Sequence, residues 1–222
     1  VEQDIDPNCL PLEDTIEIAH AKGVKVTVDA AGQIYPLENF GKYVRMGADF
    51  QCIAAKYMGA SQSTGLALGT SEMIRDIGYQ SFVGYEGRRI RGVGRPQKVD
   101  RQEMIGVVAA VKRWFTMNHE ERLAAVESQS QNMLAPLQGI PGLNAVMLDN
   151  IIGHQPFGVE IEVDESAAGM SAQDIVDKLK AGDPPVWTRV REGESNIVLH
   201  GFGLNEGQDK IVGARIAELF GR

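Results

Sequence analysis

Two short apolar runs, each followed by one charged residue, constrain the fold of this chain more than any other feature. The run 24–28 is followed by Asp29, and the run 50–55 is followed by Lys56. Each run has the length of a buried strand, and helical patterns flank both, which indicates α/β units around a buried, largely parallel sheet. Ligands of open α/β sheets collect at the carboxyl ends of the strands. We therefore expect Asp29 and Lys56 to lie at one edge of the sheet.

The periodicity of the chain predicts the remaining elements. Asp100, Asn118 and Ser171 are predicted to cap three of the helices, proline begins others, and glycine follows several of them. Helices are predicted over 11–22, 36–46, 71–78, 101–117, 118–134, 171–180 and 206–220, and strands over 24–29, 49–54, 64–70, 143–149, 157–163, 186–191 and 196–200. The Gly- and Arg-rich segment 78–99 lacks a clear period, so a long functional or interfacial loop is predicted there.

These elements predict three regions along the chain. Residues 1–100 would form an incomplete large domain, 101–135 two long connecting helices, and 136–222 a small α+β domain. Only one helix and one strand precede Asp29, so the sheet would have open edges and uncovered apolar faces. We therefore expect the C-terminal part of a larger protein, or a chain that a partner completes.

Composition limits the classes of partner. The net charge of −8, from 30 acidic and 22 basic residues, argues against a surface that coats nucleic acid. No apolar run reaches the roughly 18 residues that a membrane span needs. The chain has only two cysteines, so a reducing cytoplasm is the expected location rather than a disulfide scaffold. The histidines and cysteines lack metal-ligand spacing, and no metal site is predicted.

An acid and an amine at neighbouring strand ends suit one cofactor in particular. Burial favours the neutral form of an amine, and a neutral lysine condenses with an aldehyde to give a Schiff base. A carboxylate at the next strand end would stabilise a cation, and pyridoxal phosphate needs both groups. The alternatives are that Asp29 caps the turn into the following "AAGQ" and that Lys56 extends from the strand end into solvent.

The segments "VTVDAAGQIYPLENF", "GADFQCIAAKYMGASQSTGLALGT" and "GVGRPQKVDRQEMIGVVAAV" occur in that order. Together they resemble fold type I pyridoxal-phosphate enzymes. Within these, they resemble the selenocysteine-synthase-like branch of seryl-tRNA selenium transferase and sugar-acid ammonia-lyases. The resemblance runs from about residue 10 to the end and is strongest over 24–113. It implies the C-terminal part of the large domain, with a mostly parallel sheet, followed by a small α+β domain.

The resemblance also implies roles for individual residues. Asp29 would pair with the pyridine nitrogen of pyridoxal 5'-phosphate, and Ala31 would pack against the ring face. Lys56 would form the Schiff base and then act as general acid and base at the substrate α-carbon. The loop after this lysine commonly reaches the cofactor phosphate of a neighbouring subunit, so a homo-oligomer is expected. Its candidate residues are Gln62, Ser63 and Thr64, and a plain turn is the alternative.

Three basic residues are candidates for substrate binding. Arg95 and Lys98 in "GRPQKV" would lie near the mouth of the site and bind a carboxylate or phosphate. A solvated basic loop is the alternative for both. Arg189 lies in a predicted strand of the small domain, where related enzymes often place the arginine that binds the substrate α-carboxylate. Arg191 would point to the opposite face of a regular strand.

The sequence departs from the pattern of the branch in three respects. Ala54-Ala55 replaces the usual small polar pair before the lysine, which removes one contact to the phosphate. Gly59-Ala60-Ser61 replaces the usual Gly-Gly-Pro after it. The N-terminal half of the large domain, which supplies a phosphate-binding loop and a group that stacks on the ring, is not in this sequence.

These features predict a lyase or β-replacement transferase that acts on an amino acid or amino-sugar acid through a Lys56 Schiff base. The acidic net charge does not support a tRNA substrate, so we consider a small-molecule lyase more consistent with the sequence than a selenium transferase. An aminotransferase is the alternative within the fold. A non-catalytic fragment or interaction partner that retains the fold is the alternative of another class.

Overall fold

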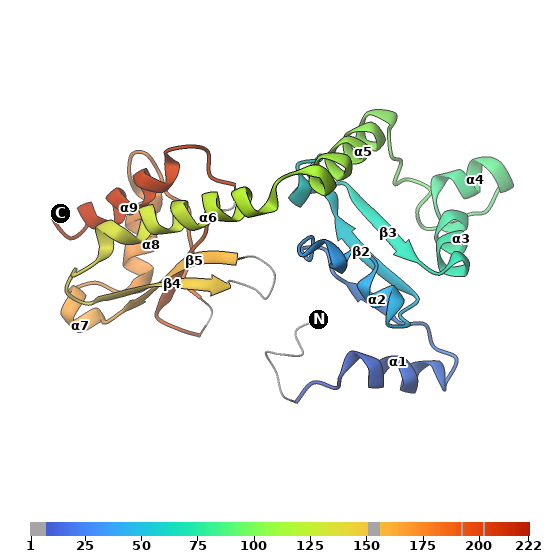
Figure 1. Cartoon of the computed structure of the whole chain (residues 1–222), viewed down its shortest axis with the longest axis horizontal. Coiled ribbons are helices and arrows are strands. Elements are labelled where there is room, and N and C mark those ends of the chain that lie inside the picture. Colours follow the sequence, from blue (N-terminus) through green and yellow to red (C-terminus); the bar gives the residue numbers. More distant parts are fainter. Residues whose placement is uncertain (1–7, 151–155, 192, 202) are drawn as a thin grey trace. The chain divides into compact units, whose positions relative to one another are not determined.

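The computed structural model describes residues 8–150, 156–191, 193–201 and 203–222. The chain divides into two compact units, 1–117 and 118–222 (Figure 1). The first unit ends with α5 (Arg101–Thr116), and the second begins with α6 (His119–Leu134). The two helices predicted to connect the domains therefore belong to different units. Among the described residues, no helix is both long enough and apolar enough to cross a membrane.

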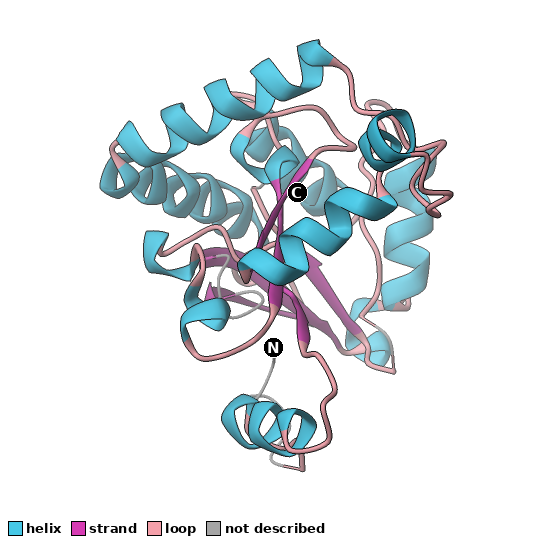
Figure 2. Cartoon of the chain, turned by 90° about the vertical axis from the view of Figure 1, so that its right-hand side faces the viewer, coloured by secondary structure: helices cyan, strands magenta, loops and turns pink. Residues whose placement is uncertain are grey.

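The sheet of the first unit has three strands in the order β1 (Thr27–Asp29), β2 (Phe50–Ala54) and β3 (Gly65–Gly69). β1 and β2 are parallel, and β3 joins β2 as an antiparallel strand. Leu12 and Ile16 of helix α1 (Leu12–His20) are buried in a cluster with Val28 and other residues around β1. Figure 1 and Figure 2 show the backbone of this helix and of the strands. The parallel pair that carries Asp29 and Lys56 agrees with the prediction.

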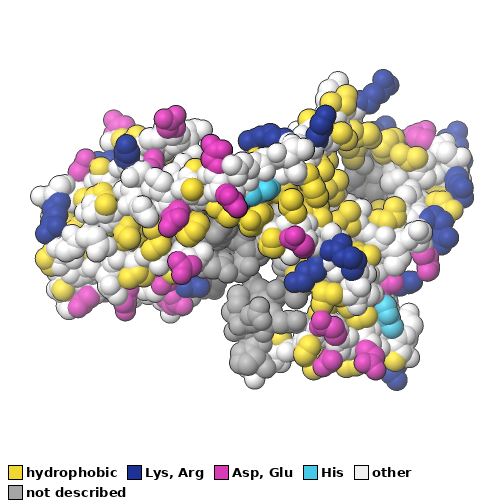
Figure 3. All heavy atoms as spheres, viewed as in Figure 1, with side chains coloured by type: hydrophobic (Ala, Val, Ile, Leu, Met, Phe, Trp, Pro, Cys, Tyr) yellow, Lys and Arg dark blue, Asp and Glu magenta, His cyan; other side chains and the backbone are white. Residues whose placement is uncertain are grey.

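Helix α5 covers the end of this sheet. Its Ala110 and Trp114 are buried in a cluster with Ile53 of β2, and the Trp114 indole N–H donates to the Ile34 carbonyl at 2.8 Å. Val108 of the same helix is exposed. Figure 3 shows hydrophobic side chains gathered near α5, where Met104, Ile105, Val108 and Phe115 are exposed.

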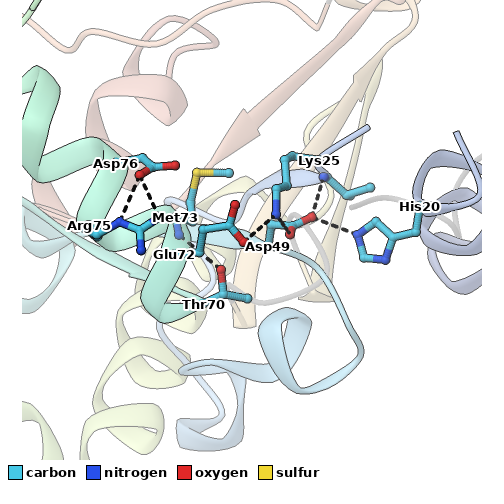
Figure 4. Close-up of polar contacts among 9 residues, drawn as sticks. His20, Lys25, Asp49, Thr70, Glu72, Met73, Arg75 and Asp76 are labelled. Atoms are coloured by element: carbon cyan, nitrogen blue, oxygen red, sulfur yellow. Dashed lines mark hydrogen bonds and ion pairs between the residues drawn. The ribbon is translucent and has the colours of Figure 1, made fainter. Parts of the chain in front are cut away.

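The amino ends of the strands are held together by one buried carboxylate. Asp49, just before β2, accepts hydrogen bonds from the Val26 amide at 2.8 Å and from His20 Nε2 at 2.8 Å (Figure 4). Lys25 Nζ lies 3.3 Å from the other oxygen of Asp49 and 3.2 Å from Glu72 of α3 (Ser71–Gln80). Burial raises the pKa of Asp49, but the bonds from Val26, His20 and Lys25 outweigh it and lower the pKa to about 2.

Two predicted elements of the first unit are wrong. In place of one helix over 36–46 the structure has the 3-10 helix η1 (Leu37–Asn39) and the short helix α2 (Lys42–Arg45). Gly41 separates them because its φ of +76° is left-handed and cannot continue a helix. The segment 78–99 is not one loop, since it contains the end of α3 (Ser71–Gln80) and α4 (Phe82–Arg88).

The glycines that suggested a loop have a packing role instead. Gly92 and Gly94 lie against the backbone of Gln80, and an added Cβ would come within 2.4 Å and 2.7 Å of its carbonyl oxygen. The Gly94 amide donates to that oxygen at 2.9 Å. The chain after α4 therefore folds back onto the end of α3.

The second unit contains the antiparallel sheet β4 (Leu143–Asn150), β5 (Pro156–Val163) and β6 (Asn196–Leu199). Its other elements are η3 (Ala135–Leu137), α7 (Glu165–Ala168), α8 (Ala172–Ala181) and α9 (Gln208–Glu218). Leu137, Ile161, Leu179, Ile197 and Ile216 are among the buried side chains of its core.

The strand predicted over 186–191 is wrong. Only Val190 forms a bridge, to Ile197 of β6, and the Val186 amide donates instead to the Leu179 carbonyl of α8 at 2.9 Å. Pro184 and Pro185 lack an amide hydrogen and cannot extend a ladder. The Ser171 cap of α8 is confirmed as a reciprocal capping box with Asp174.

Candidate functional site

Asp29 and Lys56 lie at the carboxyl ends of two adjacent parallel strands. β1 ends at Asp29, which pairs in register with Cys52 of β2. Lys56 follows the end of β2 in the 3-10 helix η2 (Ala55–Met58). Both residues therefore lie at the same edge of the sheet, as the sequence predicted.

The backbone of Ala31 links the two strand ends. Its amide donates to Asp29 Oδ1 at 3.1 Å, and its carbonyl accepts a bond from the Ala54 amide at 2.9 Å. Ala54 is the last residue of β2, two positions before Lys56. The turn after Asp29 is thus fixed to the strand that leads to the lysine.

The Asp29 carboxylate is exposed, and one of its oxygens, Oδ1, accepts two hydrogen bonds. Cys52 Sγ lies 3.2 Å from Oδ1, and the Ala31 amide binds the same atom. The thiol bond and then the amide bond lower the pKa of Asp29 below its ordinary value. Among the described residues, no hydrogen bond or ion pair involves Oδ2. The carboxylate is therefore ionised at neutral pH with one oxygen available to a cation or an N–H group.

Lys56 is half-buried beside Tyr57. Its Nζ lies 5.1 Å from the centroid of that ring. Within the described part of the chain, Lys56 forms no salt bridge. An amine without a carboxylate partner is suited to covalent chemistry or proton transfer more than to a structural ion pair.

The loop after Lys56 is tied to the start of η2. The Ala55 amide donates to the Thr64 carbonyl at 3.0 Å, and the Thr64 hydroxyl donates to the Ser61 carbonyl at 2.7 Å. Gln62 is exposed. The Ser63 hydroxyl donates to Glu103 of α5 at 3.2 Å. A bond from Ser63 to a phosphate would therefore require this hydroxyl to leave a carboxylate.

The predicted substrate-binding residues have other contacts. Arg95 lies 4.3 Å from the centroid of the Tyr85 ring and 3.4 Å from Glu86, both of α4. Lys98 is exposed, with its Nζ 6.0 Å from the ring centroid of Phe82 in the same helix. Arg189 is exposed in the second unit, on an irregular segment instead of the predicted strand. A substrate contact for any of the three stays a prediction.

Cys52 contacts Asp29 in the structure, and no sequence pattern had indicated this residue as part of the site. Cys52 was assigned only to a buried strand, yet the register of β1 and β2 brings its thiol to Asp29. Alternation along β2 could have indicated this, because Cys52 and Ala54 share the face opposite to the buried Gln51 and Ile53. The register itself needs the structure.

The architecture of this chain matches part of a known fold. A parallel strand pair with an antiparallel third strand, long helices and a small antiparallel α+β unit form the C-terminal part of the fold of fold type I pyridoxal-phosphate-dependent enzymes. The structure of D-glucosaminate-6-phosphate ammonia-lyase matches 98% of this chain and 56% of its own with a TM-score of 0.70 and 22% identity.

Two curated proteins are similar in sequence. A 5'-C-glycyluridine monooxygenase-decarboxylase from Streptomyces sp. is 28% identical over 81% of this chain and 42% of its own length. D-glucosaminate-6-phosphate ammonia lyase from Salmonella typhimurium is 22% identical over 97% of this chain and 54% of its own. The chain thus spans about half the length of the curated relatives it matches. No family model matches.

Proposed function

We propose that this chain is the C-terminal part of a pyridoxal-phosphate-dependent enzyme and that Asp29 and Lys56 hold the cofactor. The observation that carries the proposal is the pairing of β1 with β2, which brings a carboxylate and an amine to one edge of a parallel strand pair. A capping acid accounts for the bond from the Ala31 amide to Asp29 but not for the thiol bond from Cys52, and a solvated lysine does not account for the half-burial of Lys56.

The residues present fit this cofactor. The ionised Asp29 has its Oδ2 available for the protonated pyridine nitrogen, and Lys56 has an amine for the aldehyde. On the sheet face of Asp29 and Cys52, the neighbouring positions Ala54 and Ala67 carry only methyl side chains. Small side chains there leave room for a flat ring.

When bound, pyridoxal phosphate supplies an electron sink for the pair of electrons left by a bond broken at the substrate α-carbon. Asp29 would hold the positive charge on the pyridine nitrogen, because a carboxylate with a lowered pKa stays ionised at neutral pH. Lys56 Nζ would remove the proton from the substrate α-carbon and return it at the end of the reaction. Ala31 would contact the ring face.

For the reaction itself we propose an ammonia-lyase that acts on an amino acid or amino-sugar acid. The support is the sequence similarity to D-glucosaminate-6-phosphate ammonia lyase over nearly the whole chain. Arg95 and Lys98 are the residues that we propose for an acidic group of the substrate, with Arg189 for the α-carboxylate. A homo-oligomer, a β-replacement transferase of the selenocysteine-synthase-like branch and a cytoplasmic location stay predictions.

The first experiment tests Lys56. The protein is purified with pyridoxal phosphate, reduced with borohydride and digested, and the modified peptide is identified by mass spectrometry. We expect a visible absorption band and a covalent adduct at Lys56, both lost in Lys56→Ala. Lys42→Ala is the matched control, because Lys42 also precedes a tyrosine and lies 5.5 Å from its ring centroid. A missing band, or a band that persists in Lys56→Ala, contradicts the proposal.

A second experiment separates the reaction types. The loaded protein is incubated with phosphorylated amino-sugar acids and with unphosphorylated amino acids, and ammonia and keto acid are measured. A lyase releases both without a second substrate. Without a keto-acid acceptor, an aminotransferase releases at most one equivalent of keto acid per bound cofactor and no ammonia. Keto-acid release beyond that equivalent only when an acceptor is added, with no ammonia, would contradict the lyase assignment.

A further inference from the structure

We infer that Cys52 is a positioning residue for Asp29: its thiol donates to Oδ1 and leaves Oδ2 directed to the ligand of the site. The identity of that ligand as pyridoxal phosphate rests on the proposed function. The contact between the thiol and the carboxylate does not, and the two can be tested separately.

Among the described residues, the geometry gives Asp29 one oxygen with two donors and one oxygen with none. Oδ1 accepts from Cys52 Sγ at 3.2 Å and from the Ala31 amide at 3.1 Å. One donor comes from the neighbouring strand and the other from the turn that follows β1. Two donors from different directions fix the carboxylate plane, which a single donor would leave free to rotate about χ2.

The pair is isolated from other charges on the sheet. Asp29 and Cys52 are the only titratable side chains of β1, β2 and β3, which read "TVD", "FQCIA" and "GLALG". The residue that pairs with Cys52 on its other side is Ala67 of β3. Of the two strands that flank Cys52, only β1 places a charged side chain, Asp29, next to the thiol.

The protonation states of Cys52 and Asp29 allow the thiol to donate a hydrogen bond to the carboxylate. Burial, and then the Asp29 carboxylate, raise the pKa of Cys52 above its ordinary value, so the thiol stays protonated at neutral pH and can donate. The same bond is the largest cause of the lowered pKa of Asp29. A thiol held in this form is a hydrogen-bond donor and a poor nucleophile, which separates its role from that of Lys56.

Alkylation of the cofactor-free protein tests the contact. In a Cys9→Ser background, Cys52 is the only cysteine, and its rate of reaction with iodoacetamide is measured against pH. We expect Asp29→Asn to move the midpoint of this profile to lower pH and to raise the rate at neutral pH by about threefold to tenfold. Asp164→Asn, in the second unit, is the control and leaves the profile unchanged. An unchanged profile in Asp29→Asn overturns the inference.

Substitution of the thiol tests its effect on the ligand. Cys52→Ser keeps a donor of similar size, and Cys52→Val places a somewhat larger apolar side chain there without a donor. We expect pyridoxal phosphate to bind Cys52→Ser within about twofold of the parent and Cys52→Val about tenfold more weakly, since a donor to a charged group is lost. Equal affinities of the two variants, with equal thermal midpoints, overturn the positioning role. If the parent takes up no cofactor, the proposed function fails and the alkylation profile alone decides whether the thiol holds Asp29.

Discussion

Asp29 and Lys56 differ in the number of hydrogen-bond and ion-pair partners that the described residues give them. The carboxylate has two donors on one oxygen, whereas the amine has an aromatic neighbour and, among the described residues, no ion pair. This difference agrees with the roles proposed for them. A group that only stabilises charge works best when it is fixed, and a group that transfers protons must move between partners.

Glu103 offers a test of the loop after Lys56. Glu103→Gln removes a negative charge beside Ser63 and keeps an acceptor for its hydroxyl. If residues 62–64 contact the cofactor phosphate, its affinity rises by about threefold to tenfold, because a like charge has been removed. Fluorescence titration with pyridoxal phosphate measures this affinity. Glu120→Gln, in the first turn of α6, is the control. An unchanged or weaker affinity in Glu103→Gln counts against the phosphate contact.

Acid unfolding tests Asp49. A carboxyl whose pKa is lower in the folded than in the unfolded state stabilises the fold above its unfolded pKa. That contribution is lost as the pH falls through the folded pKa, which is about 2 for Asp49. At neutral pH we expect Asp49→Asn to lower the free energy of unfolding by about 1–3 kcal/mol. The difference from the parent should shrink as the pH falls from about 4 to about 2.

The measurement uses the buried Trp114 as a reporter of the first unit. Urea unfolding is followed by tryptophan fluorescence in a Trp187→Phe background, because the exposed Trp187 belongs to the second unit. Asp76→Asn, which alters an exposed pair with Arg75, is the control. A difference between parent and Asp49→Asn that stays constant down to about pH 2 would show that Asp49 does not carry this acid sensitivity.

At the scale of elements, local signals predicted some structures well and others badly. Asp100 and Asn118 cap α5 and α6 as predicted, because a cap is a contact within a few residues. The strand over 186–191 failed because the amide of Val186 bonds to α8, a contact that periodicity cannot indicate. The register that joins Cys52 to Asp29 is of the same kind, since it depends on two strands far apart in sequence.

Alanine substitutions at Gly92 and Gly87 form a matched pair that tests the packing of segment 78–99 against the end of α3. Gly92→Ala brings a methyl group against the Gln80 backbone, which cannot move like the end of a side chain, and we expect a loss of about 1–3 kcal/mol in unfolding free energy. Gly87 lies in α4 with nothing within 4 Å of an added Cβ, so Gly87→Ala should stabilise by up to about 1 kcal/mol. Urea unfolding measures both. Equal effects would contradict the packing role of Gly92.

At the scale of the whole molecule, the chain has two units that each enclose their own core. The second unit has one cluster around Leu179, Ile161 and Ile216, and the first has two clusters. A unit with its own core can open while another stays folded. The sequence predicted an incomplete large domain over 1–100, two connecting helices over 101–135 and a small domain over 136–222, whereas the structure divides between α5 and α6.

Cys52 can report whether the units open separately. Leu179 is fully buried, so Leu179→Ala should destabilise the second unit by about 2–5 kcal/mol. We expect the alkylation rate of Cys52 in mild urea to stay at the parent value in Leu179→Ala. Ile53→Ala, which removes a fully buried side chain beside Cys52, should raise it. Equal acceleration by both substitutions would mean that the two units unfold together.

Ala31 has a consequence for how such a site can diversify. Both bonds that tie the turn to the strand ends use backbone atoms, so its methyl group plays no part in them. A larger or more polar side chain could therefore reshape the surroundings of a bound molecule while the anchoring of the acid persists. Saturation mutagenesis for altered substrate preference would best begin at Ala31, because substitutions of its side chain leave both backbone hydrogen bonds in place.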